Sequence, residues 1–511
     1  MDEVHGVMHI RRPTGASFQR ETIDDKKILA PAGRSAALVL SICLAGFILS
    51  LVINYPGFMN YDSVQQLLEA RAGVYADLHP PFLAFLWHLT DRIIPGPFGM
   101  LIVETALVWC GTYLISLFWF SDAHPILRLS PCLLVFYPPI FGISGAIWTD
   151  VLMWAFLTLA IGMAGAIKPV LTATGYRSIA KFALGSMFLF AAILCRHNAL
   201  IAVMPLVALG VVRGLGADRS PRRFVAGSVI GGLAFAAMLF GAMLVNNALT
   251  SHRALTWHLC AFFDIAGVIH GLPDADEQKA IYDRLPAQVR GSGSLENLIL
   301  TYNPANVETL FQLEHPAFRP EPFTKAQPNI IVGESDLSAQ DQRALMNLWL
   351  ETVFHHPLAW LRHRISVFQV ISGFHHDQSG MVFMKPNGFP GWVKHIYGYR
   401  SPELNVFQKG VNWVLAHLSE QTFFWQPWCY LVLTVLLIGA CLAFRTLERI
   451  EIALIAASGL AHEGGLFLFA PGADFRYSHY MIYTSGLALL LFLKTLRYKR
   501  EATLKPIVIG H

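Results

Sequence analysis

Long apolar stretches alternate with polar segments along most of the chain. About 20 apolar residues carry a helix across some 30 Å of hydrocarbon, so each stretch predicts a transmembrane helix. Ten spans are predicted, although 182–196 is short. They cover residues 36–54, 98–120, 126–143, 149–167, 182–196, 199–213, 224–247, 424–444, 450–470 and 477–493.

Two shorter segments, 62–72 and 80–94, predict helices that lie on the membrane surface. Lys and Arg are concentrated in every second loop. Because basic residues favour the cytoplasmic side, this alternation places the tails 1–35 and 494–511 in the cytoplasm. Counting 80–94 as a span would move the later basic loops outside.

The same pattern divides the chain into modules. An N-terminal transmembrane module, 36–247, contains a first outer loop at 55–97. A polar outer insertion at 248–423 separates it from the C-terminal transmembrane helices at 424–493. The expected fold is therefore an all-α polytopic membrane protein with a large, mostly helical outer insertion between the seventh and eighth spans.

The insertion 248–423 is rich in Pro, His, Asn and acidic residues. We expect a small helical soluble domain over about 250–355. The segment Leu358–Gly373 then predicts an amphipathic helix, and Gly291–Ser294 predicts a flexible turn.

Composition agrees with this class. The chain has 511 residues, of which 54% are hydrophobic and 14% charged, whereas soluble domains carry about a quarter charged residues. The net charge of +4 is too small and dispersed to indicate nucleic-acid binding. The seven cysteines form no CxxC metal motif and no disulfide framework, and no secretory signal peptide is predicted.

The unusual polar residues all fall on the outer side in this topology. Asp62 and His79 lie in the first outer loop, Asp150 opens the fourth span, and Arg196-His197-Asn198 precedes the sixth. The turn 471–477 precedes the last span. Charged groups near a membrane are costly and usually functional or paired. Their shared side predicts an outward-facing polar cavity.

Several short motifs carry a resemblance to a known superfamily. They are Tyr61-Asp62-Ser63, then Gly73, Tyr75 and His79-Pro80-Pro81, then Thr149-Asp150, Arg196-His197-Asn198-Ala199-Leu200 and Asp474-Phe475-Arg476-Tyr477. Their order and sidedness resemble the GT-C integral membrane glycosyltransferases, which include protein O-mannosyltransferases and lipid A aminoarabinose transferases. Many members have Asp-Glu where this chain has Asp62-Ser63, and the outer insertion matches no domain of theirs that we can name.

The resemblance implies an enzyme that moves a sugar from a polyprenyl phosphate to an acceptor hydroxyl on the outer side of the plasma (inner) membrane. The acceptor would be a glycan, a lipid or a protein. Module 36–247 would carry catalysis, with Asp62 as the general base. The implied substrate-binding residues are Tyr61, His79, Asp150, Arg196, His197, Asp474, Arg476 and Tyr477.

Each of these residues also has a simpler interpretation. Asp62 is suited to cap the surface helix near Ser63, and Asp150 to cap the helix from Val151. His79 could only fix the turn before Pro80. Arg196 and Arg476 are suited to bind the departing phosphate. Either could instead extend to lipid headgroups, and Arg476 could simply pair with Asp474.

A metal is left open. His355-His356 and His375-His376-Asp377 contain metal-ligand types, but adjacent histidines without i, i+4 spacing are poor evidence for one site. Some GT-C enzymes use a divalent metal and others do not, so the resemblance leaves the question undecided.

Functions of other classes are also compatible with the chain. A transporter or flippase would be expected to show paired repeats and charged residues near the midplane, and the sequence indicates neither. A non-catalytic assembly protein would keep the scaffold without needing Asp62. A polymer ligase would need an Arg-rich outer loop with a catalytic His, for which His315-Pro316 is a thin match.

Overall fold

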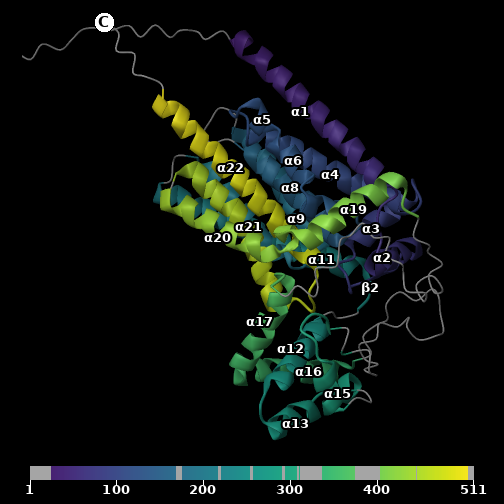
Figure 1. Cartoon of the computed structure of the whole chain (residues 1–511). Coiled ribbons are helices and arrows are strands. Elements are labelled where there is room, and N and C mark those ends of the chain that lie inside the picture. The colour runs from purple at the N-terminus through teal and green to yellow at the C-terminus, as the bar shows by residue number, and fades with distance from the viewer. Residues whose placement is uncertain are drawn as a thin grey trace, which may run out of the picture.

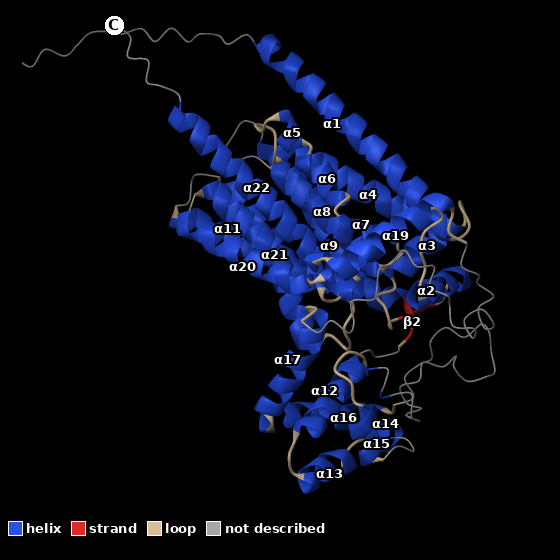
Figure 2. Ribbon diagram, viewed as in Figure 1, coloured by secondary structure: helices blue, strands red, loops and turns tan. Residues whose placement is uncertain are grey.

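The computed structural model is an elongated helical bundle with a smaller helical domain at one end (Figures 1 and 2). It describes residues 25–167, 175–216, 220–253, 257–290, 294–307, 310, 337–374, 403–444 and 446–504. The helices of the bundle are α1 (Asp25–Asn54), α4 (Pro97–Phe118), α5 (Pro125–Arg128), α6 (Ser130–Val135), α7 (Pro138–Ser144), α8 (Thr149–Ala166), α9 (Gly175–Cys195), α10 (Ala199–Leu215), α11 (Pro221–Leu249), α20 (Pro427–Phe444), α21 (Leu447–Phe469) and α22 (His479–Leu504).

Six of these helices are long and apolar enough to cross a membrane, namely α1, α4, α8, α9, α11 and α21. Helices α10 and α20 are apolar but shorter. The expectation of an all-α, multi-pass protein is thereby confirmed, whereas the number of ten spans stays a prediction. Helix α9 begins at Gly175, so the stretch 182–196 underestimated its length.

The segment 126–143 is not the single straight helix that its apolarity predicted. It divides into α5, α6 and α7, with a bend of 52° between the part ending at Val135 and the part starting at Pro138. Pro138 has no amide hydrogen to donate to the preceding turn, so α6 cannot continue through it. The bent pair counts as a seventh crossing only if both halves belong to one span.

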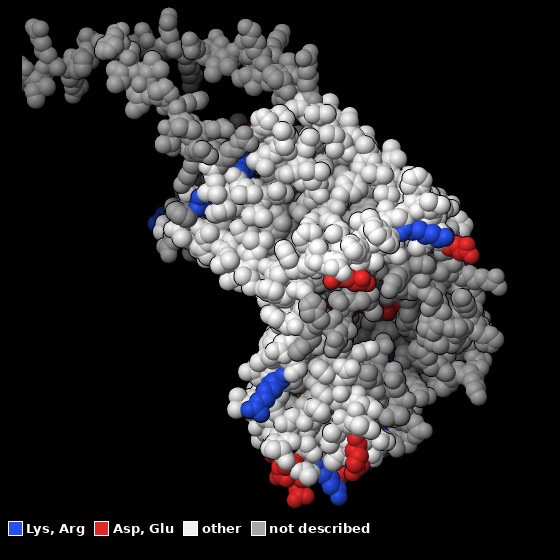
Figure 3. All heavy atoms as spheres, viewed as in Figure 1, with Lys and Arg blue, Asp and Glu red and all other residues white. Residues whose placement is uncertain are grey.

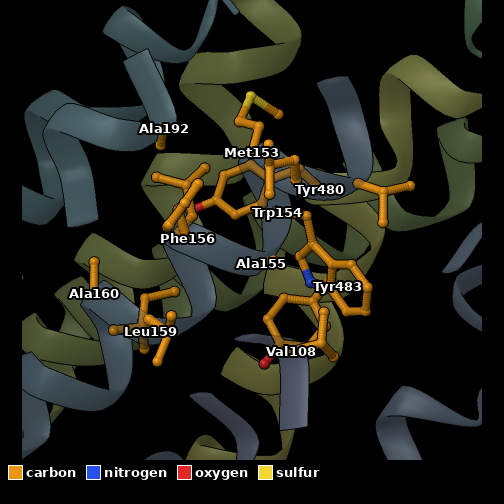
Figure 4. Close-up of a cluster of buried hydrophobic side chains, with 14 of the residues drawn as sticks. Val108, Met153, Trp154, Ala155, Phe156, Leu159, Ala160, Ala192, Tyr480 and Tyr483 are labelled. Carbon is orange, nitrogen blue, oxygen red and sulfur yellow. The ribbon is translucent and has the colours of Figure 1, made fainter. Parts of the chain in front are cut away.

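Helix α8 is the core of the bundle. Every residue from Thr149 to Ala166 is buried, and α4 and α9 pack closely along it. Figure 4 shows Trp154 of α8 beside the ring of Tyr483 from α22. The Trp154 and Tyr483 ring centroids lie 5.4 Å apart in an edge-on contact.

The helices at the periphery expose apolar side chains instead. Of the most apolar 18-residue stretch of each helix, only 22% is buried in α1 and only 17% in α11. On the face shown in Figure 3, charged side chains are sparse over the bundle and gather near its two ends. This distribution suits a belt of lipid around the bundle.

Two helices form within the predicted first loop, while their position at the membrane surface stays a prediction. They are α2 (Tyr61–Ala72) and α3 (Phe82–Asp91), and they pack against each other. The structure adds a short parallel ladder that the all-α prediction did not include. In it β1 (Tyr75–Ala76) pairs with β2 (Thr250–His252), which follows α11. The ladder joins the first loop to the start of the insertion.

Six further helices lie within the predicted insertion 248–423. They are α12 (Trp257–Gly271), α13 (Ala275–Asp283), α14 (Ala287–Arg290), α15 (Leu295–Thr301), α16 (Ala339–His355) and α17 (Pro357–Ile371). We call these helices, with residues 302–307, the insertion domain. The buried residues of its core include Phe262, Leu298, Leu345 and Val367.

Two further elements connect the insertion to the bundle. Helix α17 coincides with the predicted amphipathic segment and contacts α21. Helix α19 (Val406–Gln421) returns to the bundle and contacts α1 and α7. Of the predicted turn 291–294, only Ser294 lies within the described residues, where it caps α15.

The insertion domain lies at the end of the bundle where α1 ends and α4 begins (Figure 1). We call this the site end. The first turn of α1 and the last turn of α22 lie at the opposite end. The shared cytoplasmic side expected for the tails 1–35 and 494–511 stays a prediction.

Candidate functional site

Asp62 owes its place to the start of α2. Asn60, not Asp62, is the N-cap, because the Asn60 side chain accepts from the Ser63 amide at 3.1 Å. The Ser63 hydroxyl in turn accepts from the Asn60 amide and completes a capping box. Asp62 therefore lies in the first turn with its carboxylate available for other contacts. The simpler interpretation, that Asp62 caps this helix, is wrong.

The segment before α2 is fixed to the connection between α7 and α8. The Phe58 amide donates to the Gly145 carbonyl at 2.8 Å, and the Ile147 amide donates back to Phe58 at 2.9 Å. The Ser63 hydroxyl donates to the Ile147 carbonyl at 2.8 Å. These bonds bring the start of α2 beside the start of α8, where Asp150 lies.

Arg476 connects three acidic residues that are far apart in the sequence. Its guanidinium lies 2.8 Å from Asp62, 2.9 Å from Asp474 and 4.0 Å from Asp150. The Arg476 side chain is 12% exposed. The pairing with Asp474 predicted as a simple alternative does occur, but Asp62 makes an equally short contact.

The local chain directs Arg476 into this position. Asp474 caps the short 3-10 helix η5 (Phe475–Ser478) and accepts from the Arg476 amide at 3.0 Å. The guanidinium lies over the Trp148 ring, with its central carbon 4.7 Å from the ring centroid. Aromatic faces favour a guanidinium, so Trp148 limits where this side chain can go.

A second arginine pairs with Asp150. Arg196, from the loop between α9 and α10, forms an ion pair with the almost completely buried Asp150. Its guanidinium lies over the Tyr477 ring at 4.9 Å. Asp150 is in the first turn of α8, which begins at Thr149. Its carboxylate is therefore engaged with Arg196 and does not act as the predicted N-cap.

His79 completes the described network. Its Nε2 atom lies 3.7 Å from Asp62, so its role is not confined to the turn before Pro80. The site network, as we call it, comprises Asp62, His79, Asp150, Arg196, Asp474, Arg476 and Tyr477. Five separate stretches of sequence meet in it, and each precedes or opens a helix.

The surroundings shift the pKa values of Asp62 and Asp474 in opposite directions. Burial would raise the pKa of Asp62, but Arg476 and His79 more than offset it and hold this pKa far below its usual range. For Asp474, burial outweighs the attraction of Arg476 and raises the pKa. Asp62 is thus held as a carboxylate, and of these two acids Asp474 takes up a proton more readily.

The network has an excess of acid. Its three carboxylates (Asp62, Asp150, Asp474) face two guanidinium groups (Arg196, Arg476), which leaves one negative charge when all the acids are ionised. An incoming phosphate adds a further negative charge. Uptake of a proton by the network would therefore favour the binding of an anion.

Two predicted residues, Tyr61 and His197, remain. Tyr61 begins α2, and its side chain lies outside the described part of the structure. The His197 side chain is exposed, with Asp77 and Arg196 as its charged neighbours.

Sequence reasoning missed several groups near the site. His462 and Glu463 are buried within α21, and Glu104 is buried within α4. Among the described residues, neither nitrogen of His462 and neither oxygen of Glu104 has a hydrogen-bond partner. A signal was present, because an ionisable residue inside an apolar span is functional by default. These residues were overlooked because spans 98–120 and 450–470 are strongly apolar on average.

The metal question remains where the sequence left it. Within the described residues, no group of three or more His, Cys, Asp or Glu side chains is arranged to hold an ion. His355 contacts the Glu351 carbonyl and His356 lies 3.7 Å from Glu277, so these neighbours face different partners. The motif 375–377 lies outside the described residues.

No protein-family model, curated protein or solved structure matches this chain.

Proposed function

We propose that this protein is a membrane glycosyltransferase that moves a sugar from a polyprenyl phosphate to an acceptor hydroxyl. The observation that carries the proposal is the convergence of Asp62, Asp150, Arg196 and Arg476 at one end of the bundle. A carboxylate that can take a proton stands beside two guanidinium groups suited to a phosphate, as this reaction requires.

In the proposed reaction the acceptor oxygen attacks the anomeric carbon of the donor. The bond from that carbon to the phosphate oxygen breaks, and the bonding electrons leave with the phosphate. Arg476 and Arg196 would stabilise this leaving group. Asp62 would accept the proton of the acceptor hydroxyl.

The contact between Arg476 and Asp62 suggests an order for these events. While Arg476 holds Asp62, the low pKa of this carboxylate makes it a weak base. A donor phosphate that draws Arg476 away would let burial raise the pKa of Asp62. The base would then strengthen only when the donor is in place.

The test is transfer of radiolabelled sugar from polyprenyl phosphate in membranes containing wild type or Asp62→Asn. Asp283→Asn is the matched control, because Asp283 is a half-exposed residue of the insertion domain. We expect wild type and Asp283→Asn to transfer sugar, and Asp62→Asn to lose at least 100-fold, on the order of a general base's contribution. Equal transfer by a folded Asp62→Asn protein would exclude this role.

One observation favours a transporter or flippase as a second candidate. Glu104, His462 and Glu463 lie inside predicted spans, six or seven residues from the site end of their helices, or about 10 Å deep. The sequence analysis had found no such intramembrane charges. Movement of a lipid-linked glycan across proteoliposomes, abolished by Glu104→Gln while sugar transfer is absent, would favour this candidate.

A further inference from the structure

The turn that carries Arg476 is held by the insertion domain. The Ala473 amide donates to the Ala305 carbonyl at 2.6 Å, and the Val307 amide donates to the Pro471 carbonyl at 3.1 Å. Between them, Asn306 and Gly472 form an antiparallel bridge. The position of this turn therefore depends on a segment about 170 residues earlier in the chain.

A second attachment lies one residue before this pairing. Arg364 of α17 is fully buried, and its Nη1 atom donates to the Ala470 carbonyl at 2.8 Å. Its Nη2 atom lies 2.5 Å from Asp264 of α12. Arg364 thus spans the gap between the core of the insertion domain and the end of α21.

Asp264, the acidic partner of Arg364, has several further contacts. Asp264 accepts from the Trp349 indole at 2.8 Å and lies 3.1 Å from the His363 Nε2 atom. The other nitrogen of His363 lies 2.7 Å from the Tyr302 hydroxyl. Tyr302 lies three residues before Ala305, the first residue of the segment that pairs with the turn, so the buried cluster adjoins both attachments.

A buried ionic cluster of this kind contributes little net stability to a fold. Burying an ion pair costs several kcal/mol per ion, and apolar residues of similar volume often stabilise as well or better. Hydrogen bonds are directional, whereas apolar packing is not. The bond from Arg364 therefore fixes the position and orientation of one backbone carbonyl. That carbonyl, of Ala470, lies six residues from Arg476.

We propose that the Asp264–Arg364 pair is a positioning device that sets the place of Arg476 in the site network. The insertion domain would thereby control the donor-phosphate contact without touching the donor. This inference rests on the proposed function for its consequence in catalysis. The placement of the turn can be tested without any enzymatic assay.

The first test measures amide hydrogen exchange of residues 470–477 in the full-length protein. Arg364→Lys keeps the positive charge but loses the two-sided geometry of the guanidinium. We expect at least tenfold faster exchange in this turn, with exchange in α8 unchanged. Arg284→Lys is the matched control, since Arg284 forms a comparable but exposed pair with Glu351 in the same domain.

A second variant covers the case in which Arg364→Lys does not fold. Val307→Pro removes the amide that donates to Pro471 and leaves the buried cluster intact. Proline also favours an extended conformation at Asn306, which the bridge already uses. Unchanged exchange in the turn of Arg364→Lys would overturn the positioning role of the Asp264–Arg364 pair. Unchanged exchange in Val307→Pro would overturn the premise that the insertion domain holds this turn.

The second test asks whether Arg364 acts through Arg476, using binding of polyprenyl phosphate in detergent micelles. We expect Arg364→Lys to weaken binding at least tenfold in the wild-type background and less than twofold in Arg476→Lys. Independent, additive losses would show a general structural effect and refute the positioning role. Faster exchange in a protein that does not bind polyprenyl phosphate would instead refute the proposed function alone.

Discussion

Arg476→Gln is the most informative single substitution, because it removes the guanidinium and keeps a side chain of similar length. Arg476 faces Asp62 at 2.8 Å and Asp474 at 2.9 Å. At an effective dielectric constant of about 20, a contact of this length between unit charges provides a gross attraction of about 6 kcal/mol.

Much of that attraction offsets the cost of removing the charges from water. Breaking a buried pair by removing one partner costs roughly 3–5 kcal/mol. The Asp62 and Asp474 side chains are 21% and 18% exposed, so water can partly solvate them. We therefore expect the free energy of unfolding to fall by about 3 kcal/mol at neutral pH, at the lower end of that range.

The effect should depend on pH in a defined direction. In the wild type the lowered pKa of Asp62 contributes stability above the unfolded pKa of about 3.9, and this is lost as the pH falls through the folded pKa. In Arg476→Gln, burial is opposed only by His79, so protonation relieves the unpaired carboxylate. The deficit of the variant should shrink between pH 7.5 and pH 5.

Denaturing-detergent titrations of the purified protein at the two pH values measure this deficit. Arg290→Gln is the control, because Arg290 and Asp283 form an exposed pair at 3.8 Å, and such pairs contribute about 0–1 kcal/mol. A loss of less than about 0.5 kcal/mol from Arg476→Gln, equal at both pH values, would mean that the network behaves as solvated surface charge.

Three further outcomes can be checked. Asn60→Ala should lower the free energy of unfolding by about 1 kcal/mol through loss of the N-cap, and unchanged stability in the same titration would contradict the capping box. Gly459→Ala should reduce the monodisperse fraction in size-exclusion chromatography, because its Cβ would lie 2.1 Å from the Thr484 hydroxyl, whereas Gly232→Ala, with open space around it, should not. Binding of polyprenyl phosphate should strengthen from pH 7.5 to 5.5 as Asp474 takes up a proton, and a flat pH profile in the absence of divalent cations would argue against that coupling.

The sequence predicted which polar residues would share one end of the bundle, but not which would touch. Asp62, Asp150 and Arg476 each stand where an apolar stretch begins or ends, and helices that cross the same layer bring such positions to a common level. Their pairing depends on side-chain direction. That direction follows from the capping box at Asn60 and the backbone bonds at Phe58, neither of which hydropathy encodes.

At two other places the structure differs from the sequence prediction because neighbouring residues favour different local structures. Asn60 and Asp62 are both good N-cap residues, and the Ser63 side chain decides between them by bonding back to the Asn60 amide. The apolar run 126–143 favours a straight span, and Pro138 overrides that preference. The contact of Arg364 with Ala470 joins positions 106 residues apart, which a reading of local patterns cannot reach.

The way the site network is distributed along the chain has a consequence for biosynthesis. Because a chain emerges from the ribosome N-terminus first, Asp62 and Asp150 are made long before Arg476. The 305–307 segment that receives the last turn is also made earlier. A nascent chain that has not reached α22 therefore carries Asp62 without Arg476, whereas Asp150 can already pair with Arg196. The contact between Arg476 and Asp62 and the pairing of the last turn with 305–307 can therefore form only after this final part of the chain has been made.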